Sequence, residues 1–202
     1  MRFLALGDSY TIGEGVPEAE RWPVQLAVRL RERGAAIGAP EIIARTGWTT
    51  DELSAAIGTA APGGRYALVT LMIGVNNQFR GRDLDEYRRQ FQALLTQAVG
   101  FAGSEPSRVL VLSIPDWGVT PFAAGRDRGR IAADIDRFNA VALEETDSAG
   151  ARYIDVTPIS REAAHDSSLI APDGLHPSGR MYARWVDVAM EPAMEAFEGG
   201  AR

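Results

Sequence analysis

The 202-residue sequence contains no cysteine and no lysine. Without cysteine, these residues form no disulfide bond, no thiolate nucleophile and no cysteine-ligated zinc site. Without lysine, they supply no P-loop lysine, no Schiff-base lysine and no Ser–Lys dyad. Histidine is almost as scarce, because His165 and His176 are the only two. A mechanism that needs a base titrating near neutral pH must therefore use one of these two side chains.

Basic charge and long apolar runs are also scarce. The formal net charge is −6, which argues against a nucleic-acid partner because phosphate binding needs a basic surface. No segment approaches the roughly 20 apolar residues that cross a membrane. The apolar run at residues 3–6 ends at Gly7, before it reaches the length of an export signal. We expect a cytoplasmic protein with no integral membrane segment, folded as one domain over residues 1–202.

Two kinds of apolar pattern alternate along the chain. Short apolar runs predict strands at residues 3–6, 41–44, 66–73, 108–114 and 153–156. Longer segments with helical spacing predict helices at residues 20–33, 50–57, 84–99, 131–148 and 178–197. This alternation is typical of an α/β fold in which helices cover both faces of a parallel sheet. The nearly continuous run at residues 66–73 is expected at the centre of that sheet.

A glycine-rich turn at residues 7–15 follows the first expected strand and contains Ser9. In an open parallel sheet, ligands bind outside the carboxyl ends of the strands, where this turn is expected to lie. A serine hydroxyl is a weak nucleophile and needs a base that removes its proton during attack. Turn serines also commonly hydrogen-bond their own backbone. Ser9 alone therefore leaves a catalytic and a structural interpretation open.

A second candidate motif, Asp173-Gly174-Leu175-His176-Pro177, precedes the last expected helix. An acid and a histidine three residues apart in such a turn can face each other across the bend. The carboxylate would then accept the Nδ1–H of the imidazole and leave Nε2 free to act as a base. The same residues fit the beginning of a helix with Pro177 in its first turn. Both interpretations remain open for the motif taken alone.

The turns after the second and third expected strands contain Gly47 and Asn76. Acyl transfer places negative charge on the carbonyl oxygen of the substrate, and fixed N–H donors stabilise it. Gly47 would let a backbone N–H approach a substrate closely, and Asn76 offers a side-chain amide. The alternatives are a glycine chosen for positive φ and an ordinary turn asparagine.

Together these motifs resemble the SGNH hydrolases, also called the GDSL esterase/lipase family. The resemblance rests on four blocks in the family's order, which span nearly the whole chain: Gly7-Asp8-Ser9-Tyr10, Gly47, Gly74-Val75-Asn76-Asn77 and Asp173-Gly174-Leu175-His176-Pro177. It implies that Ser9 is the nucleophile, His176 the general base and Asp173 the acid that orients it. The implied oxyanion hole consists of Gly47, Asn76 and the backbone N–H of Ser9.

The resemblance also implies a fold, a three-layer α/β/α sandwich around a five-stranded parallel sheet of flavodoxin-like order. We expect neither a metal ion nor another cofactor. The sequence departs from the commonest family pattern twice, because Tyr10 replaces a leucine and Asn77 stands where the family often has an aspartate. The Gly-x-Ser-x-Gly pentapeptide of α/β-hydrolases does not surround Ser9.

Candidates for a substrate pocket lie near the strand ends: Tyr10, Trp48, Asn77, Trp117 and Phe122. The tryptophan and phenylalanine rings could equally pack loops onto the sheet. The loop at residues 115–130 carries Arg126, Arg128 and Arg130. We expect these arginines on a solvated face, and a lid that contacts an acidic substrate is the alternative.

Other titratable residues near the strand ends are expected to be structural. Asp8 is interpreted as a hydrogen-bonding residue of the serine turn, and neither Asp116 nor Asp155 as the acid of a triad. His165 and Asp166 are expected in a solvated loop, because adjacent side chains usually diverge.

The expected function is hydrolysis of carboxylic esters of small molecules, with short-chain acyl esters, above all acetyl esters, as substrates. A thioesterase or lysophospholipase of the same family is the alternative within enzymes. A flavodoxin-like ligand-binding module is the alternative outside them. The sequence makes no prediction about the oligomeric state.

Overall fold

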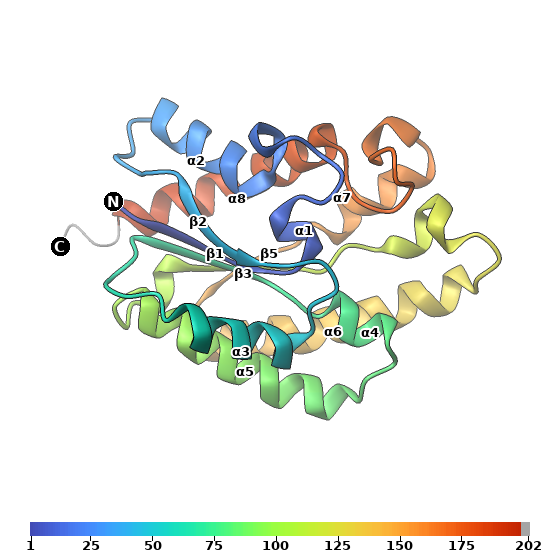
Figure 1. Ribbon diagram of the computed structural model, residues 1–202, viewed down its shortest axis with the longest axis horizontal. Coiled ribbons are helices and arrows are strands. Elements are labelled where there is room, and N and C mark those ends of the chain that lie inside the picture. Colours follow the sequence, from blue (N-terminus) through green and yellow to red (C-terminus); the bar gives the residue numbers. More distant parts are fainter. Residues whose placement is uncertain (199–202) are drawn as a thin grey trace.

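The computed structural model describes residues 1–198 and contains a five-stranded sheet (Figure 1). Its strands are β1 Phe3–Gly7, β2 Pro40–Ala44, β3 Leu68–Met72, β4 Val109–Leu112 and β5 Arg152–Ile154. All strand pairs are parallel, and the order across the sheet is β2-β1-β3-β4-β5. The predicted α/β fold with a flavodoxin-like parallel sheet is confirmed.

The register of β1, β2 and β3 brings their carboxyl ends level. Gly7 at the end of β1 pairs with Ala44 at the end of β2 and with Met72 at the end of β3. The turns that follow these strands therefore begin side by side at one edge of the sheet. Every residue of β1 and of the central strand β3 is buried, as a sheet covered on both faces requires.

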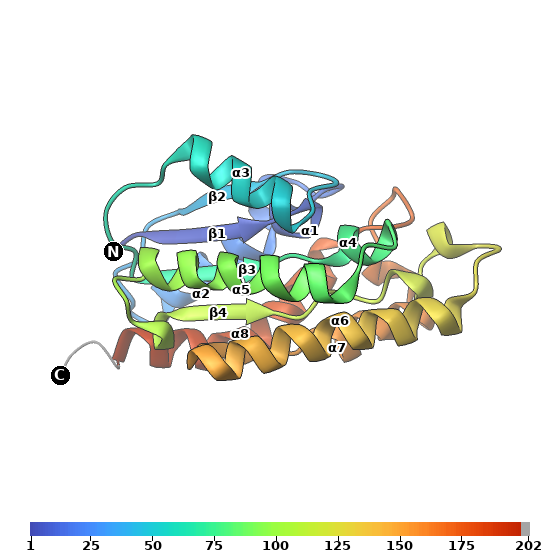
Figure 2. The same ribbon diagram turned by 90° about the horizontal axis from the view of Figure 1, so that it is seen from below.

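Helices connect the strands and cover both faces of the sheet. The α-helices are α1 Ser9–Ile12, α2 Trp22–Glu32, α3 Thr50–Ala60, α4 Val75–Phe79, α5 Leu84–Phe101, α6 Arg128–Ala149, α7 Thr157–Arg161 and α8 Gly179–Glu198. Single 3₁₀ turns are η1 Glu18–Glu20, η2 Pro106–Arg108, η3 Trp117–Val119, η4 Pro121–Ala123, η5 Glu162–Ala164 and η6 Ser167–Leu169. Helices α2 and α8 lie on one face and α3, α5 and α6 on the other, which gives three layers (Figures 1 and 2).

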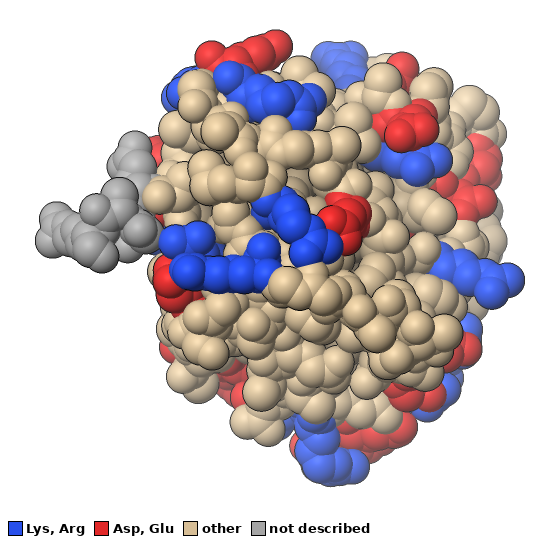
Figure 3. Space-filling view, turned by 60° about the vertical axis from the view of Figure 1, so that its left-hand side comes forward, with Lys and Arg blue, Asp and Glu red and all other residues tan. Residues whose placement is uncertain are grey.

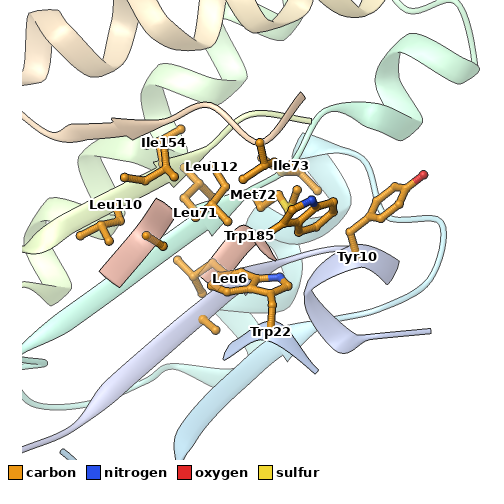
Figure 4. Close-up of a cluster of buried hydrophobic side chains, with 14 of the residues drawn as sticks. Leu6, Tyr10, Trp22, Leu71, Met72, Ile73, Leu110, Leu112, Ile154 and Trp185 are labelled. Atoms are coloured by element: carbon orange, nitrogen blue, oxygen red, sulfur yellow. The ribbon is translucent and has the colours of Figure 1, made fainter. Parts of the chain in front are cut away.

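The core under α2 and α8 is built around two tryptophans. Trp22 of α2 and Trp185 of α8 are fully buried beside Leu6 of β1 (Figure 4). Tyr10 of α1 lies at the edge of this cluster, with its ring centroid 6.4 Å from that of Trp185. Its hydroxyl points away from the cluster. Tyr10 therefore fixes the segment that carries Ser9 against the core.

Two segments expected as turns are short helices. Residues 9–12 form α1 and residues 75–79 form α4, each shortly after a strand. Asp8 caps α1, because its Oδ1 accepts the backbone N–H of Tyr10 at 3.1 Å. Helices of four or five residues are too short to give a recognisable apolar period, so the sequence pattern indicates only turns there.

The longer helices begin or end a few residues from their predicted limits. Helix α3 continues to Ala60, and α5 continues to Phe101. Helix α6 begins at Arg128, because the side chain of Asp127 caps it by accepting the N–H of Arg130 at 2.9 Å. These differences leave the order of the elements unchanged.

Figure 3 shows the face at the amino ends of the strands, near the chain termini. Acidic and basic side chains are mixed there with a larger uncharged area. Ion pairs at this end of the sheet include Arg2–Glu41, Arg65–Glu105 and Arg152–Glu195; exposed pairs of this kind stabilise a fold only slightly. No helix within residues 1–198 is long and apolar enough to span a membrane.

Candidate active site

Ser9 is the first residue of α1, two residues after the end of β1. The residue is 5% exposed. Its backbone N–H forms no hydrogen bond within the described residues, as expected for the first position of a helix. The turn requires glycine at position 7, because a Cβ there would collide with Thr11 and with the carbonyl oxygen of Met72. This close packing fixes the backbone that presents Ser9.

Asp8 lies beneath this turn and is 1% exposed. Its Oδ1 accepts the N–H of Tyr10, and its Oδ2 lies 3.5 Å from Nδ2 of Asn76. Burial raises the pKa of the Asp8 carboxyl to about 7, although the hydrogen bond from the Tyr10 backbone acts in the opposite direction. These contacts give Asp8 the hydrogen-bonding role that the sequence predicts.

Asp173 and His176 face each other across a tight turn. Oδ2 of Asp173 lies 2.6 Å from Nδ1 of His176. Its Oδ1 accepts the backbone N–H groups of Leu175 and His176, at 2.9 Å each. Gly174 has a φ of +75°, which side chains rarely permit. The N–H of Ala171 closes the turn by donating to the carbonyl oxygen of His176 at 2.7 Å.

The hydrogen bonds to Asp173 keep its carboxylate ionised. Burial alone would raise its pKa, but the His176 ring and the two backbone donors outweigh burial and lower the pKa below the ordinary value of 3.8. His176 is 7% exposed. Helix α8 begins at Gly179, so the motif precedes the helix and does not form its first turn.

Ser9, Asn76 and His176 line one cavity of about 100 Å³ at the carboxyl edge of the sheet. The remaining lining is largely apolar and aromatic: Tyr10, Val75, Phe79, Trp117, Phe122 and Leu175. Figure 1 shows why these distant segments meet, because α1, α4, the loop after β4 and the segment before α8 all lie at this end of the molecule. The structure thus brings the predicted nucleophile, base and amide donor together.

Asn76 lies in the first turn of α4, with its side chain held by the turn after β2. Its Nδ2 donates to the carbonyl oxygen of Trp48 at 2.9 Å. Gly74, just before α4, has a φ of +131°, and a Cβ there would lie 2.7 Å from the ring of Tyr87. Glycine at this position therefore allows α4 to begin where Asn76 reaches the cavity.

Gly47 is not among the residues that line the cavity. Its φ is +85°, and its carbonyl oxygen accepts Nη2 of Arg80 at 2.6 Å. Its N–H has no hydrogen-bond partner within residues 1–198. Together with the bond from Asn76 to Trp48, the Arg80 bond ties the Gly47 turn to α4.

Three of the five candidate pocket residues line the cavity, and two do not. Tyr10, Trp117 and Phe122 line the cavity, whereas Trp48 and Asn77 do not. The Trp48 side chain packs, partly buried, against the hydrophobic core instead. Asn77 is fully buried, because the helical turn of α4 directs it away from Asn76 and into the protein.

Asn77 connects α4 to the start of α3. Its Oδ1 accepts the backbone N–H of Thr50 at 3.1 Å, and its Nδ2 donates to Thr50 Oγ1 at 2.7 Å. The residue thus anchors the turn that follows β2. An asparagine makes both bonds without placing a charge in the interior.

Val75, Phe79 and Leu175 line the cavity and were missed by the sequence analysis. Phe79 lies three residues after Asn76, and residues three apart share one face of a helix. If α4 had been recognised as a helix, Phe79 would have been predicted to lie on the same face as Asn76 and to line the cavity. Leu175 immediately precedes the predicted base.

The other titratable residues take structural roles. Asp116 is paired with Arg161 at 2.9 Å, and Asp155 accepts the hydroxyl of Ser113 at 3.0 Å. His165 is exposed. Asp166 accepts the hydroxyl of Ser168 at 2.6 Å, so its carboxylate is engaged within its own loop. Within the described part of the chain, no group of three acidic or histidine side chains could hold a metal ion.

The sequence matches the GDSL-like lipase/acylhydrolase family over residues 5–184. The chain belongs to this family. As a GDSL-like hydrolase it is a carboxylic ester hydrolase, and the family resemblance inferred from the four motifs is confirmed. A comparison with curated proteins gives no match.

Several solved structures share the fold of this GDSL-like hydrolase over almost its whole length. TesA superposes with a TM-score of 0.75 at 18% identity, covering 97% of this chain and 99% of TesA. The acetyl xylan esterase AlAXEase gives 0.72 at 16% identity, with 95% and 98% covered. The psychrotrophic esterase EstA from Pseudoalteromonas sp. gives 0.71 at 16% identity, with 98% of each chain covered. At these identities the likeness establishes the fold.

Proposed function

We propose that this hydrolase cleaves short-chain acyl esters, acetyl esters above all, with Ser9 as nucleophile, His176 as general base and Asp173 as the orienting acid. One observation carries the proposal: a histidine whose Nδ1 is bound by a carboxylate at 2.6 Å shares a small cavity with a serine at a strand end. A histidine held in this way presents Nε2 as a base. His165 is exposed on a loop and has no comparable partner among the described residues.

The reaction proceeds in two halves through an acyl-enzyme. Ser9 Oγ attacks the ester carbonyl while Nε2 of His176 takes the hydroxyl proton. The tetrahedral intermediate collapses, and His176 returns the proton to the departing alcohol oxygen. Water then attacks the acyl-Ser9 carbonyl with His176 again as base, which releases the carboxylic acid and restores the serine. Throughout, ionised Asp173 stabilises the imidazolium that forms at His176.

Three N–H donors are available for the negative charge on the carbonyl oxygen. The backbone N–H groups of Ser9 and Gly47 have no partner among residues 1–198. The Asn76 amide donates to the Trp48 carbonyl oxygen at 2.9 Å and makes a longer contact of 3.5 Å with Oδ2 of Asp8. The substrate oxygen would take the N–H that makes this longer contact. Donors fixed before reaction stabilise the developing charge without reorganising. Gly47 itself does not line the cavity.

The size and lining of the cavity favour a short acyl group. Its volume is about 100 Å³, whereas pockets for drug-sized ligands measure roughly 300–1,000 Å³. The apolar walls suit a methyl or short alkyl group beside the reacting carbonyl. The acetyl xylan esterase of the same fold points to the same substrate class.

A fluorophosphonate probe tests the nucleophile directly. We expect labelling at Ser9, located by mass spectrometry of the modified peptide, and loss of labelling in the Ser9→Ala and His176→Ala variants. His165→Ala is the matched control, because it removes the other histidine of the chain and should label normally. A folded parent protein that is not labelled, or is labelled elsewhere, contradicts the proposed triad.

A series of p-nitrophenyl esters tests the acyl group. We expect kcat/KM to be highest for acetate to butyrate and to fall at longer chains. A maximum at eight or more carbons contradicts the short-chain proposal and leaves the triad untouched. An acetyl thioester cleaved faster than the matching oxygen ester would assign the protein to thioesterases instead.

A further inference from the structure

An aromatic cluster forms part of the cavity wall, and one arginine stacks against it. The rings of Phe79, Trp117 and Phe122 contact one another, with centroids 5.3 to 6.1 Å apart. The guanidinium carbon of Arg126 lies 5.2 Å from the Phe79 centroid and 5.3 Å from each of the other two. All three rings also line the cavity that holds Ser9 and His176. Arg126 therefore borders the aromatic wall of the site, although it does not itself line the cavity.

The three rings position the Arg126 guanidinium without neutralising it. A guanidinium over aromatic faces gains cation–π attraction, yet its N–H donors remain free for an anion. Among the described residues Arg126 forms neither a salt bridge nor a side-chain hydrogen bond. Other arginines have their own partners: Arg128 the carbonyl oxygen of Thr120, Arg130 the carboxylate of Asp134 and Arg161 that of Asp116. The adjacent acid, Asp127, uses its Oδ1 to cap α6.

The next two arginines of the chain lie in the first turn of α6 and are placed differently. Arg128 reaches the carbonyl oxygen of Thr120 at 3.4 Å, and Arg130 lies 3.9 Å from Asp134. Neither stacks on the aromatic cluster. The chain as a whole is acidic, with a net charge of −6, so a cation without an acidic partner beside the site would attract an anionic substrate group. A guanidinium fork matches the geometry of a carboxylate.

We propose that Arg126 determines specificity by binding a carboxylate at the far end of the acyl group, so that half-esters of short dicarboxylic acids are cleaved in preference to neutral esters of equal acyl length. The inference rests on the proposed function, because the reacting carbonyl must lie at Ser9. The methylene carbons of such an acyl group contact Phe79 and Phe122 in the cavity. The terminal carboxylate then passes the aromatic rim and meets the guanidinium.

Matched methyl esters test this assignment. We compare kcat/KM for monomethyl succinate, glutarate and adipate with kcat/KM for methyl butyrate, valerate and hexanoate, measuring methanol release. The ratio of anionic to neutral substrate at equal length should exceed one in the parent enzyme at one of these lengths. In Arg126→Gln that ratio should fall about tenfold, which corresponds to roughly 1.4 kcal/mol, while the neutral esters change less than twofold.

Two controls separate recognition from a structural role. Arg128→Gln removes a charge two residues away, at the start of α6, without touching the rings and should leave the ratio unchanged. Arg126→Lys keeps the charge but not the fork, and should give an intermediate ratio that falls further with added salt. An equal loss for anionic and neutral esters in Arg126→Gln would mean that Arg126 only holds the aromatic wall, and the inference would be wrong.

The outcomes also separate this inference from the proposed function. Hydrolysis of neutral methyl esters that depends on Ser9, with an anionic-to-neutral ratio unaffected by Arg126→Gln, overturns the inference alone. Hydrolysis that persists in Ser9→Ala overturns the proposed function, and the inference falls with it.

Discussion

Asp173 contacts His176 through both of its carboxylate oxygens. Oδ2 lies 2.6 Å from the ring Nδ1, and Oδ1 accepts the backbone N–H of the same histidine at 2.9 Å. One oxygen therefore orients the imidazole while the other shapes the turn that carries it. An amide in place of the carboxylate can satisfy only one of these two contacts in the same way.

We expect Asp173→Asn to fold normally and to lose most of its activity. The amide oxygen can still accept the backbone N–H groups, but the amide NH₂ then faces Nδ1 and shifts the ring proton to Nε2. A histidine in that tautomer cannot take the serine proton, and kcat should fall by about 10³–10⁴-fold. Kinetics with p-nitrophenyl acetate and a thermal melt check this. A variant that melts at the same temperature as the parent and retains its kcat would show that Asp173 is not the acid of the triad.

Replacement of Asn76 by alanine should slow turnover with little effect on KM. The amide stabilises charge that develops only after attack, and removal of one such donor typically costs about 10²–10³-fold in kcat. Asn76→Asp should be at least as slow, because it offers no donor and places a carboxylate beside the oxyanion. Steady-state kinetics on acetate esters measure both variants. A change confined to KM would show that Asn76 only binds the substrate.

The arrangement of the sheet could be predicted because strands and long helices have clear apolar periods. The run at residues 66–73 is buried on both sides as β3, and alternation of strands and helices leads to a parallel sheet. The short helices α1 and α4 could not be predicted in the same way. Their presence depends on local capping, such as that of Asp8, and on packing such as that of Gly74 against Tyr87.

The site was predictable where one motif carries the whole geometry. Asp173 and His176 meet within a single turn, so their spacing allowed the contact to be proposed, and the family resemblance then selected it over a helix start. The pocket walls come from side chains whose direction depends on tertiary packing. Asn77 points inward to Thr50. Trp48, whose ring was expected in the pocket, instead accepts the side-chain amide of Asn76 with its backbone carbonyl oxygen. The sequence gives no direct signal for such directions.

Asn77→Leu should destabilise the fold, and Asn77→Asp should destabilise it less when the carboxyl is protonated at low pH. Leucine leaves the buried N–H of Thr50 without an acceptor, at a cost of about 1–3 kcal/mol in the free energy of unfolding. Aspartate keeps that acceptor but loses the N–H donor to Thr50 Oγ1, whose own hydroxyl proton is donated to Gln90 Oε1. Urea unfolding of the three proteins measures the difference. Equal stability of the leucine variant and the parent would show that the α3–α4 connection does not need this residue.

The buried carboxyl of Asp8 should make stability depend on pH. Its pKa is about 7 in the folded protein against an ordinary value of 3.8, so between these values the folded state binds more protons than the unfolded chain. The free energy of unfolding therefore falls as pH rises from about 4 to 7 and stays low above that. At 1.36 kcal/mol for each pKa unit, the cost above pH 7 is on the order of 4 kcal/mol.

Asp8→Asn should remove this dependence, because the amide oxygen still accepts the Tyr10 N–H and carries no charge. We expect parent and variant to have similar stability near pH 4, and the variant to be more stable by several kcal/mol (on the order of 4 at most) at pH 8. Urea unfolding at pH 4, 6 and 8 measures the difference, and groups common to both proteins cancel from it. The Asp85→Asn variant, which changes an exposed acid of α5, should track the parent at every pH. A constant difference between Asp8→Asn and the parent from pH 4 to 8 would mean that Asp8 does not titrate on folding, and that its hydrogen bonds outweigh its burial.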